Sequence, residues 1–245
     1  MEEEVELSPR WRIRYEDLTF DFSKPLGRGT FGTVWKGEYI GSPVAIKQLA
    51  LGGYVGENDF VKYLKREVKN LASVRHPNIV QFLGIATKTK AGGPGPQPWA
   101  SLVPEDVFLV TEFLEGGDLS RLKDPSYSSN WKLRVTILRD IARAMRHIHT
   151  LGKAFVFFPP KSHAYVFPAT KLGMMHRDLK SGNLLLSEDW TTTKVCDLGL
   201  ARRVESEVDA FMTCSGSGPW VAPEVIRREA YSFPADIFSY GRQVN

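Results

Sequence analysis

The stretch that decides the fold reads His176-Arg177-Asp178-Leu179-Lys180-Ser181-Gly182-Asn183, and Asp197-Leu198-Gly199 follows it after an apolar, strand-like segment. Two carboxylates, a lysine and an amide therefore lie close together in the chain. Oxygen ligands of this kind suit magnesium better than zinc, and a lysine can neutralise a phosphoryl group. A single Asp or Asn here could be an ordinary turn residue, but turn chemistry does not require this order. The stretch predicts a site that holds a divalent metal and a phosphate beside a hydroxyl nucleophile.

This stretch resembles the catalytic loop and metal-binding turn of protein kinases. The resemblance implies that Asp178 orients or deprotonates the substrate hydroxyl and that Lys180 stabilises the transferring phosphoryl group. It also implies that Asn183 and Asp197 hold Mg²⁺. Leu198 replaces the family's usual Phe, which changes a packing residue and keeps the metal-binding Asp. The position of Lys180, two residues after Asp178, resembles the serine/threonine-specific form of the loop.

Composition places the chain among ordinary globular proteins. Its 245 residues can bury one sizeable core or two modest lobes, and 42% of them are hydrophobic. The net charge of +4 is too small to argue for a nucleic-acid partner. Two cysteines, Cys196 and Cys214, form no disulfide framework and favour a reducing compartment. The acidic start does not fit a secretory signal, and no apolar run is long enough to span a membrane. We expect a cytoplasmic protein, with the nucleus as the alternative.

A glycine-rich stretch runs from Gly27 to Val34. Gly27, Gly29 and Gly32 would let backbone N–H groups approach a phosphate closely, although a plain hairpin turn would have a similar pattern. Strand-like residues on both sides favour a hairpin over the strand-to-helix turn of a dinucleotide fold. Upstream, Trp11 to Phe22 alternates apolar and polar residues, which predicts a half-buried strand.

A lysine and a glutamate form a second predicted pair. Period-two alternation in the strand Val44 to Lys47 puts Lys47 on one face with Ala45. Glu67 belongs to an apolar helical stripe made of Phe60, Leu64, Glu67 and Leu71. Because a buried carboxylate is costly without a partner, Lys47 is the expected partner of Glu67; alternatively, Glu67 lies at the stripe's edge and reaches water. By resemblance, Lys47 is the kinase lysine that grips the α- and β-phosphates of ATP.

The segment from Thr111 to Leu119 resembles the kinase hinge. The resemblance implies that backbone groups of Glu112 and Leu114 bind the adenine edge and that Thr111 guards the pocket behind it. Asp118 is a suitable N-cap for a short helix after it. Four apolar side chains would sandwich the adenine ring, although each alone could equally be core: Leu26, Val34, Ala45 and Leu185.

Two insertions interrupt the pattern. Buried strands are predicted at 79–86 and 107–113, and the Gly- and Pro-rich segment 87–106 between them reads as a surface loop, either a tolerated insertion or a docking element. A clear amphipathic helix follows at 131–150, with His147 and His149 off its apolar stripe and predicted to be surface residues. Residues 153–173 then separate this helix from the catalytic loop. We hypothesise that they are unspliced intron; a hydrophobic docking insert is the alternative.

The segment from Asp197 to Glu224 resembles an activation segment. The resemblance implies that an upstream kinase or autophosphorylation places a phosphate on Thr213 or Ser215, and that Arg177 and Arg202 bind it. Ser217 matches the hydroxyl that supports the catalytic Asp, whereas Gly218-Pro219 departs from the usual order beside the phosphoacceptor. The last part of this segment most resembles the tyrosine-kinase-like group, relatives of the Raf and mixed-lineage kinases.

The sequence therefore predicts a single protein kinase domain over 1–245 with the two-lobed α+β fold. A small β-rich N-lobe would occupy about 11–111, the hinge about 112–118, and a larger helical C-lobe about 119–245. Because the match fails after Gly241, we expect the C-lobe to be incomplete. The reaction would be γ-phosphoryl transfer from ATP, with Mg²⁺, to serine or threonine hydroxyls of protein substrates. A non-catalytic ATP-binding or interaction module and a non-functional fragment remain the alternatives.

Overall fold

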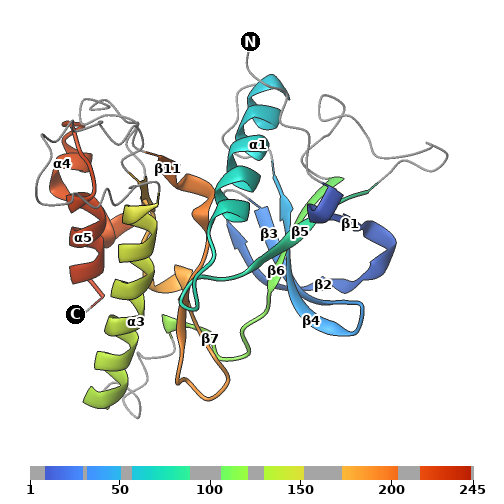
Figure 1. The fold of residues 1–245 in the computed structure, drawn as a ribbon, viewed down its shortest axis with the longest axis horizontal. Coiled ribbons are helices and arrows are strands. Elements are labelled where there is room, and N and C mark those ends of the chain that lie inside the picture. Colours follow the sequence, from blue (N-terminus) through green and yellow to red (C-terminus); the bar gives the residue numbers. More distant parts are fainter. Residues whose placement is uncertain are drawn as a thin grey trace, which may run out of the picture. The chain divides into compact units, whose positions relative to one another are not determined.

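The computed structural model describes residues 9–29, 32–50, 57–88, 106–120, 130–151, 173–203 and 216–243. The chain divides into two compact units. The first comprises Met1–Arg75 and Val80–Phe113, and the second comprises His76–Ile79 and Leu114–Asn245. The first unit is built around a β-sheet and the second carries most of the described helices (Figure 1), so each unit has the predicted composition.

The sheet of the first unit has six strands in its described part: β1 (Arg12–Arg14), β2 (Leu18–Gly29), β3 (Gly32–Tyr39), β4 (Ser42–Leu49), β5 (Phe82–Thr87) and β6 (Val107–Glu112). Their order is β1-β5-β6-β4-β3-β2. β1 is parallel to β5, and the other neighbours are antiparallel. The predicted hairpin across the glycine-rich stretch is the β2–β3 pair, in which Gly29 faces Gly32.

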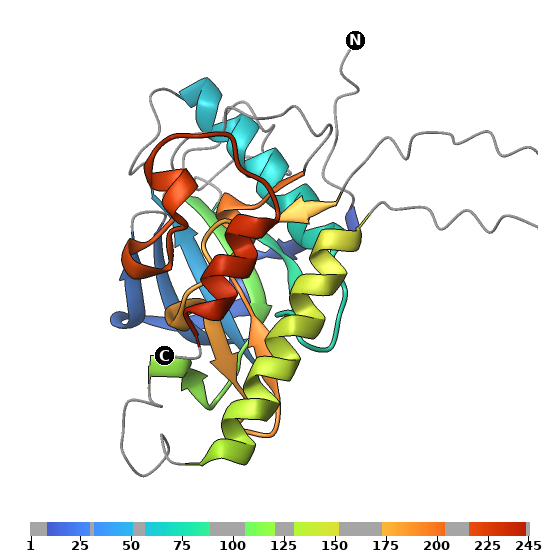
Figure 2. The ribbon, with the colours of Figure 1, turned by 90° about the vertical axis from the view of Figure 1, so that its left-hand side faces the viewer.

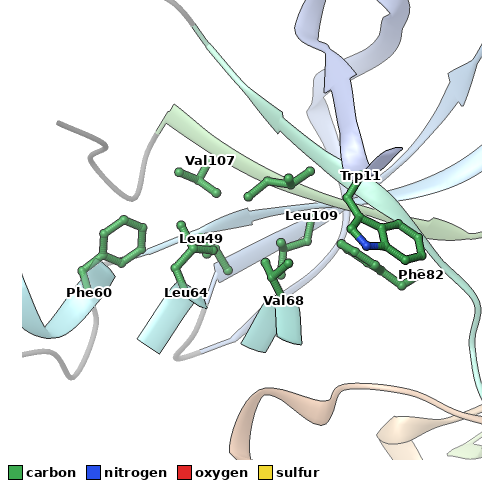
Figure 3. Packing of buried hydrophobic residues seen from close by; sticks show 9 residues of the cluster. Trp11, Leu49, Phe60, Leu64, Val68, Phe82, Val107 and Leu109 are labelled. Atoms are coloured by element: carbon green, nitrogen blue, oxygen red, sulfur yellow. The ribbon is translucent and has the colours of Figure 1, made fainter. Parts of the chain in front are cut away.

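Helix α1 (Glu57–Ser73) covers this sheet with the stripe that the sequence predicted (Figure 3). Phe60 and Leu64 are fully buried on it, and Leu71 packs at the margin of the same cluster. Burying one such side chain stabilises a fold by roughly 1.5–3 kcal/mol. The cluster holds the helix against strands of the sheet through Trp11, Leu49, Val68, Phe82, Ile85, Val107 and Leu109.

The predicted strand from Trp11 to Phe22 is wrong as one continuous element. β1 ends at Arg14, a 3-10 turn spans Tyr15–Asp17, and β2 begins at Leu18. The Arg14 side chain donates two hydrogen bonds to the Asp17 carboxylate, at 2.9 and 2.6 Å, and this closes the turn. Ile13 and Leu18 pack in one buried cluster on either side of it. The apolar residues before and after the turn therefore face the same buried cluster, although they belong to two separate strands.

The predicted strand at 79–86 also begins later than expected, because β5 starts at Phe82. Residues 76–79 belong to the second unit, where Ile79 forms an isolated parallel bridge with Val195. The Asn78 side chain donates to the carbonyl oxygen of Thr193 at 3.0 Å. Apolar sequence continues through this change of unit, so periodicity alone could not locate it.

The second unit contains α3 (Trp131–Thr150), α4 (Pro223–Ile226) and α5 (Pro234–Gly241). Its short strands are β7 (Gly117–Asp118), β8 (Met174–Met175), β9 (Leu184–Leu186), β10 (Thr193–Val195) and β11 (Arg202–Arg203). They pair in the order β10-β9-β7 and as β11-β8. α3 and α5 lie side by side (Figure 2), and the Tyr240 hydroxyl donates to the carbonyl oxygen of Leu138 at 3.2 Å.

Helix α3 has the predicted bounds. Its N-cap is Asn130, whose side-chain Oδ1 accepts from the N–H of Leu133 at 3.0 Å.

The prediction that His147 and His149 are surface residues is wrong. His149 Nε2 lies 2.8 Å from the Asp236 carboxylate, and the His147 ring stacks on that of His76 with centroids 5.0 Å apart. Both histidines lie at the margin of the buried stripe, where a polar side chain can reach a partner on a neighbouring element.

Several predictions fall on residues outside the described ranges. These are the insertion 87–106 apart from its ends, the insertion 153–173 apart from Gly173, and the phosphorylation sites Thr213 and Ser215. Asp118 accepts from the N–H of Ser120 at 2.8 Å, as an N-cap would, but the helix predicted after it lies mostly outside those ranges. None of the described helices combines the length and apolar character needed to cross a membrane.

Candidate active site

The stretch His176–Asn183 lies between β8 and β9 in the second unit. Its backbone is sharply bent, because Arg177 has a left-handed φ of 70° and Ser181–Asn183 forms a 3-10 turn. His176 is fully buried and links the bend to the segment before Asp197. Its Nδ1 accepts from the N–H of Asp178 at 3.2 Å, so its ring proton lies on Nε2, which donates to the Cys196 carbonyl oxygen at 3.0 Å.

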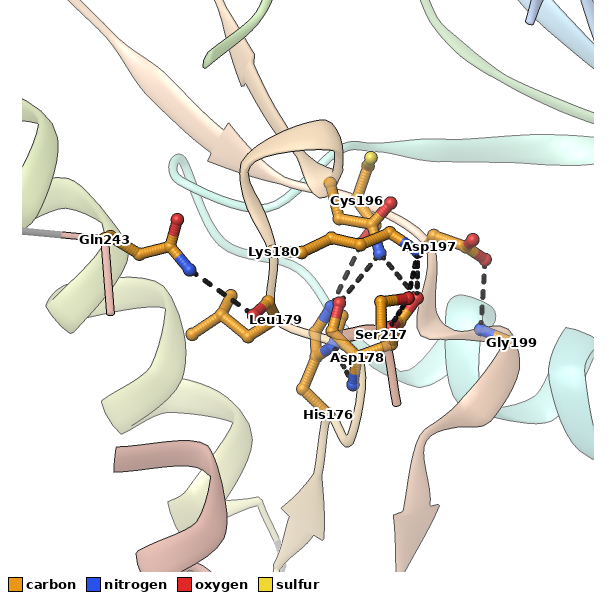
Figure 4. Close-up of polar contacts among 10 residues, drawn as sticks. His176, Asp178, Leu179, Lys180, Cys196, Asp197, Gly199, Ser217 and Gln243 are labelled. Carbon is orange, nitrogen blue, oxygen red and sulfur yellow. Dashed lines mark hydrogen bonds and ion pairs between the residues drawn. The ribbon is translucent and has the colours of Figure 1, made fainter. Parts of the chain in front are cut away.

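The Asp178 carboxylate is held by three side-chain donors (Figure 4). Ser217 Oγ donates to Oδ1 at 2.7 Å, while Lys180 Nζ and Asn183 Nδ2 donate to Oδ2 at 2.8 and 3.1 Å. Lys180 Nζ also donates to Ser217 Oγ at 2.7 Å. The predicted support of Asp178 by Ser217 is therefore present, and Asp178 is fixed in one orientation before any substrate binds.

Asn183 and Asp197 offer oxygen atoms of the kind that Mg²⁺ prefers. The Asn183 amide nitrogen donates to both the carbonyl and the carboxylate of Asp178, at 2.8 and 3.1 Å, which identifies its Oδ1 as the acceptor that remains. Asp197 has a left-handed φ of 60°, and its Oδ1 accepts from the N–H of Gly199 at 3.4 Å. Both side chains therefore carry oxygen donors of a type suited to a divalent metal ion. No cluster of three or more His, Cys, Asp or Glu side chains suited to a metal occurs within the described ranges.

Sequence reasoning missed the residue that anchors this loop, Asp236 on α5. Its carboxylate is 1% exposed and accepts from the backbone N–H groups of His176 and Arg177 at 2.8 and 2.9 Å. His149 Nε2 makes the third contact at 2.8 Å. Burial by itself would raise the pKa of Asp236, but the His149 hydrogen bond, electrostatic interactions with His176 and His149 and the Arg177 N–H together hold this pKa below its ordinary value. The sequence signal for this role was an acidic residue between apolar ones in Pro234–Gly241. The same pattern is also explained by the preference for acidic side chains in the first turn of a helix.

Arg177 points to Tyr231 in this structure. Its Nε donates to the Tyr231 hydroxyl at 3.0 Å, and its guanidinium lies 5.8 Å from the centre of the Tyr231 ring. Arg202, the other predicted phosphate ligand, lies on β11 opposite Met175. The phosphate-binding roles of both arginines stay predictions, because Thr213 and Ser215 lie outside the described residues.

In the first unit, Lys47 Nζ lies 3.6 Å from Glu67 Oε1, and Glu67 is 3% exposed. The predicted pair is therefore present, and the alternative in which Glu67 reaches water is wrong. Ala45 and Lys47 are half-buried and Val44 and Ile46 are fully buried, which confirms the predicted faces of β4. The buried carboxylate on α1 thus holds the ammonium group of Lys47 on the face of the sheet that α1 covers, where Leu49 also packs.

The glycine-rich hairpin has one position that only glycine can occupy. Gly32 has a φ of +144°, and a Cβ there would collide with the carbonyl oxygen of Gln48. A Cβ on Gly27 or Gly29 would meet nothing within 4 Å. Glycine is therefore required at position 32 because the β4 backbone passes so close to it. Gly27 and Gly29 leave open space at the hairpin, as a ligand-binding loop requires.

The predicted adenine-binding residues are divided between the two units. In the first, strand register places Val34 opposite Lys47 and Ala45 opposite Thr111, and all four are half-buried. Leu26 is exposed at a register shift in β2. The Glu112 N–H donates to the Gln81 carbonyl oxygen at 3.0 Å, so this N–H is already used within the first unit.

In the second unit, Leu185 is half-buried on β9 opposite Asp118, and Leu114 is mostly buried. Among these residues, only Leu114 has the low exposure of a core side chain. The structure thus gathers Asp178, Lys180, Asn183 and Ser217 in one unit and Lys47 with Glu67 in the other.

Comparison with known proteins agrees with this geometry. The protein kinase domain model matches residues 20–244. The probable serine/threonine-protein kinase kinX of Dictyostelium discoideum is 39% identical over 233 residues, which are 94% of this chain and 18% of that protein. The probable serine/threonine-protein kinase SIS8 of Arabidopsis thaliana is 32% identical over 230 residues, again 94% of this chain and 18% of the relative.

The chain thus spans less than a fifth of the length of these two relatives. The family match nevertheless covers most of the chain and includes the loop, the hairpin and the Lys47–Glu67 pair. It confirms the predicted two-lobed α+β fold, with a β-rich N-terminal lobe and a helical part. This chain belongs to the protein kinase family.

Proposed function

We propose that this domain transfers the γ-phosphoryl group of ATP to serine or threonine hydroxyls of protein substrates. The observation that carries the proposal is the fixed Asp178 carboxylate, with Ser217 on one oxygen and Lys180 and Asn183 on the other. A carboxylate oriented in this way can accept the proton of an incoming hydroxyl. Two features support serine/threonine specificity: the position of Lys180 two residues after Asp178, and the similarity to probable serine/threonine-protein kinases.

In this proposal, catalysis comes mainly from positioning and charge neutralisation. Asp178 orients the substrate hydroxyl toward the phosphate. Lys180 already contacts both Asp178 and Ser217, and its ammonium group neutralises charge on the transferring phosphoryl group. The Ser217 hydroxyl keeps Oδ1 of Asp178 in place when Lys180 turns toward the phosphate.

Each unit carries residues that the family resemblance assigns to nucleotide binding. Lys47, fixed by Glu67, would bind the α- and β-phosphates, and the backbone of Gly27, Gly29 and Gly32 would cover them. Asn183 and Asp197 would hold Mg²⁺, which supplies neutralisation of the β- and γ-phosphate oxygens when it is bound. In the first unit, the residues assigned to the adenine ring are Leu26, Val34 and Ala45, with Thr111 and Glu112 beside them; in the second unit they are Leu114 and Leu185.

Regulation through the activation segment extends the proposal. A phosphate on Thr213 or Ser215, added by an upstream kinase or by autophosphorylation, would draw Arg177 away from Tyr231 and pair with it and Arg202. The sequence Gly216 to Glu224 supports placement in the tyrosine-kinase-like group. A cytoplasmic location is part of the same proposal.

The test is transfer of radiolabelled phosphate from ATP to peptide libraries that differ only in the acceptor, with serine, threonine or tyrosine. We expect incorporation into serine and threonine peptides that requires Mg²⁺ and is lost on its chelation. Incorporation restricted to tyrosine would overturn the specificity. ATP-dependent thermal stabilisation without any transfer would overturn the enzymatic role and favour a nucleotide-binding module.

A further inference from the structure

Helix α3 carries a concentration of positive charge that the proposed reaction does not use. Its twenty residues hold five lysine and arginine residues and one aspartate, a net charge of +4, which equals the net charge of the entire chain. Four of these cations are exposed and recur at spacings of 7, 4 and 3 residues, which places them on one stripe of the helix. We call this stripe the α3 basic face: Lys132, Arg139, Arg143 and Arg146.

One buried carboxylate organises the centre of the α3 basic face. Asp140 Oδ2 accepts from the N–H of Thr193 on β10 at 3.1 Å. Its Oδ1 accepts from Arg139 Nε and Nη2 at 3.3 and 3.2 Å, and Arg143 Nη1 lies 3.7 Å from the same oxygen. The two guanidinium groups are therefore held side by side although their side chains are 52% and 58% exposed.

This arrangement leaves two guanidinium groups sharing one carboxylate. Each guanidinium has five N–H donors, and Asp140 uses a minority of them. Among the described residues, Asp140 is the only carboxylate that contacts an arginine of this face. Asp189, in the turn between β9 and β10, accepts hydrogen bonds from Ser187 and Thr191 of its own turn. A second carboxylate, from a binding partner, would balance the remaining positive charge of Arg139 and Arg143 and accept from their unused N–H donors.

A titratable histidine and apolar surface lie beside the face. The pKa of His76 is lowered mainly by partial burial and also by electrostatic interactions with His147 and Arg143, with Asp140 acting in the opposite direction. Trp131, 65% exposed, and Val135 continue the exposed side of α3 toward its N-terminus with apolar surface. The site thus combines arginine donors with an exposed tryptophan, two residue types that are enriched at protein–protein contacts.

We propose that the α3 basic face binds an acidic segment of a partner protein in extended conformation, with carboxylates on alternate residues. From Lys132 to Arg146 the helix rises about 21 Å, the length of about six extended residues. Alternate carboxylates in an extended strand repeat every 6–7 Å, roughly the rise of about 6 Å between Arg139 and Arg143. Four cations with apolar surface beside them suit a short peptide better than a polyanion, whose binding typically uses about 6–10 phosphate contacts. This binding is independent of phosphoryl transfer.

The test is fluorescence anisotropy with a fluorescein-labelled decapeptide in which glutamate alternates with valine or serine. The test variant is Arg143→Glu/Arg146→Glu. The matched control, Arg12→Glu/Lys69→Glu, changes the net charge equally at exposed positions of the other unit. We expect the test variant to bind at least about tenfold more weakly and the control to stay within about twofold of the parent, as oppositely charged contacts require.

Equal thermal melting of the two variants shows that both are folded, and Arg146→Gln provides a milder variant if the double one melts early. A saturating peptide should also raise the pKa of His76 in a histidine NMR titration, because it brings negative charge beside Arg143. Equal loss of affinity in test and control variants would overturn the proposal, as would no loss in either. Tighter, face-dependent binding of a single-stranded RNA or of phosphatidylserine vesicles than of the peptide would also overturn it.

Discussion

The Asp236 carboxylate on α5 lies 2.8 Å from the imidazole Nε2 of His149, the penultimate residue of α3. The same carboxylate accepts the backbone N–H groups of His176 and Arg177, next to Asp178. One buried acid therefore joins two helices to the loop that carries the proposed catalytic residue. The position of Asp178 depends on this contact as well as on its own hydrogen bonds.

Removal of this acid should destabilise the fold. Asp236→Ala leaves the backbone N–H groups of His176 and Arg177 and the His149 side chain without their acceptor, so we expect the free energy of unfolding to fall by about 3–5 kcal/mol. Urea denaturation followed by tryptophan fluorescence measures it. The exposed Glu188→Gln should change the unfolding free energy by less than about 0.5 kcal/mol. Similar values for the two variants would contradict the anchoring role.

The lowered pKa of Asp236 predicts a specific acid sensitivity. A carboxylate with a depressed folded-state pKa contributes stability above its unfolded pKa, and this contribution is lost as pH falls through the folded value. Stability should therefore drop below about pH 4, the ordinary range of an Asp side chain. In Asp236→Asn the drop should be shallower, measured by urea denaturation between pH 6 and the acid limit of folding. An equally steep drop in the variant would show that other groups cause it.

The Ser217 hydroxyl should matter for turnover more than for nucleotide binding. Ser217→Ala removes the donor to Asp178 Oδ1, so we expect kcat to fall by about 10–100-fold, the range for losing a positioning hydrogen bond. The KM for ATP should change little, and Ser217→Thr should restore most of the rate. Steady-state kinetics with a serine peptide measures both constants. A rise in KM with unchanged kcat would assign Ser217 to nucleotide binding instead.

The Lys47–Glu67 pair should couple nucleotide binding to the packing of α1. Glu67→Gln leaves the ammonium group without its charged partner, so we expect kcat/KM for ATP to fall by about tenfold or more. Lys69→Gln on the exposed side of the same helix is the control and should leave kcat/KM unchanged. If the control loses as much activity as Glu67→Gln, the loss reflects general damage to α1.

The sequence predicted those parts of the fold whose pattern has a local cause. The stripe of α1, the bounds of α3 and the β2–β3 hairpin follow from periodicity and glycine placement, and all three are present. The 3-10 turn at Tyr15–Asp17 was missed because Ile13 and Leu18 keep the same alternation on both sides of it. The late start of β5 was missed because Ile79 is apolar in either unit.

The candidate site shows the same division. Motif spacing identified Asp178, Lys180 and Asn183, and burial on an apolar stripe predicted the partner of Glu67. The role of His149 could not be predicted, because its partner Asp236 lies 87 positions away and only the packing of α5 beside α3 brings them together. A single sequence carries periodicity within an element, whereas a buried polar contact between elements depends on their docking.

The most direct test of the account compares Asp178→Asn with the parent protein in two assays on one preparation. The amide keeps the size of the side chain and can still accept from Ser217 or Lys180, but it cannot take up the substrate proton. We expect Mg²⁺-ATP to shift thermal melting as it does in the parent, while phosphate transfer to a serine peptide falls by about a thousandfold or more. Transfer close to the parent rate would contradict the role of Asp178, and equal loss of nucleotide binding would show that it serves the nucleotide site instead.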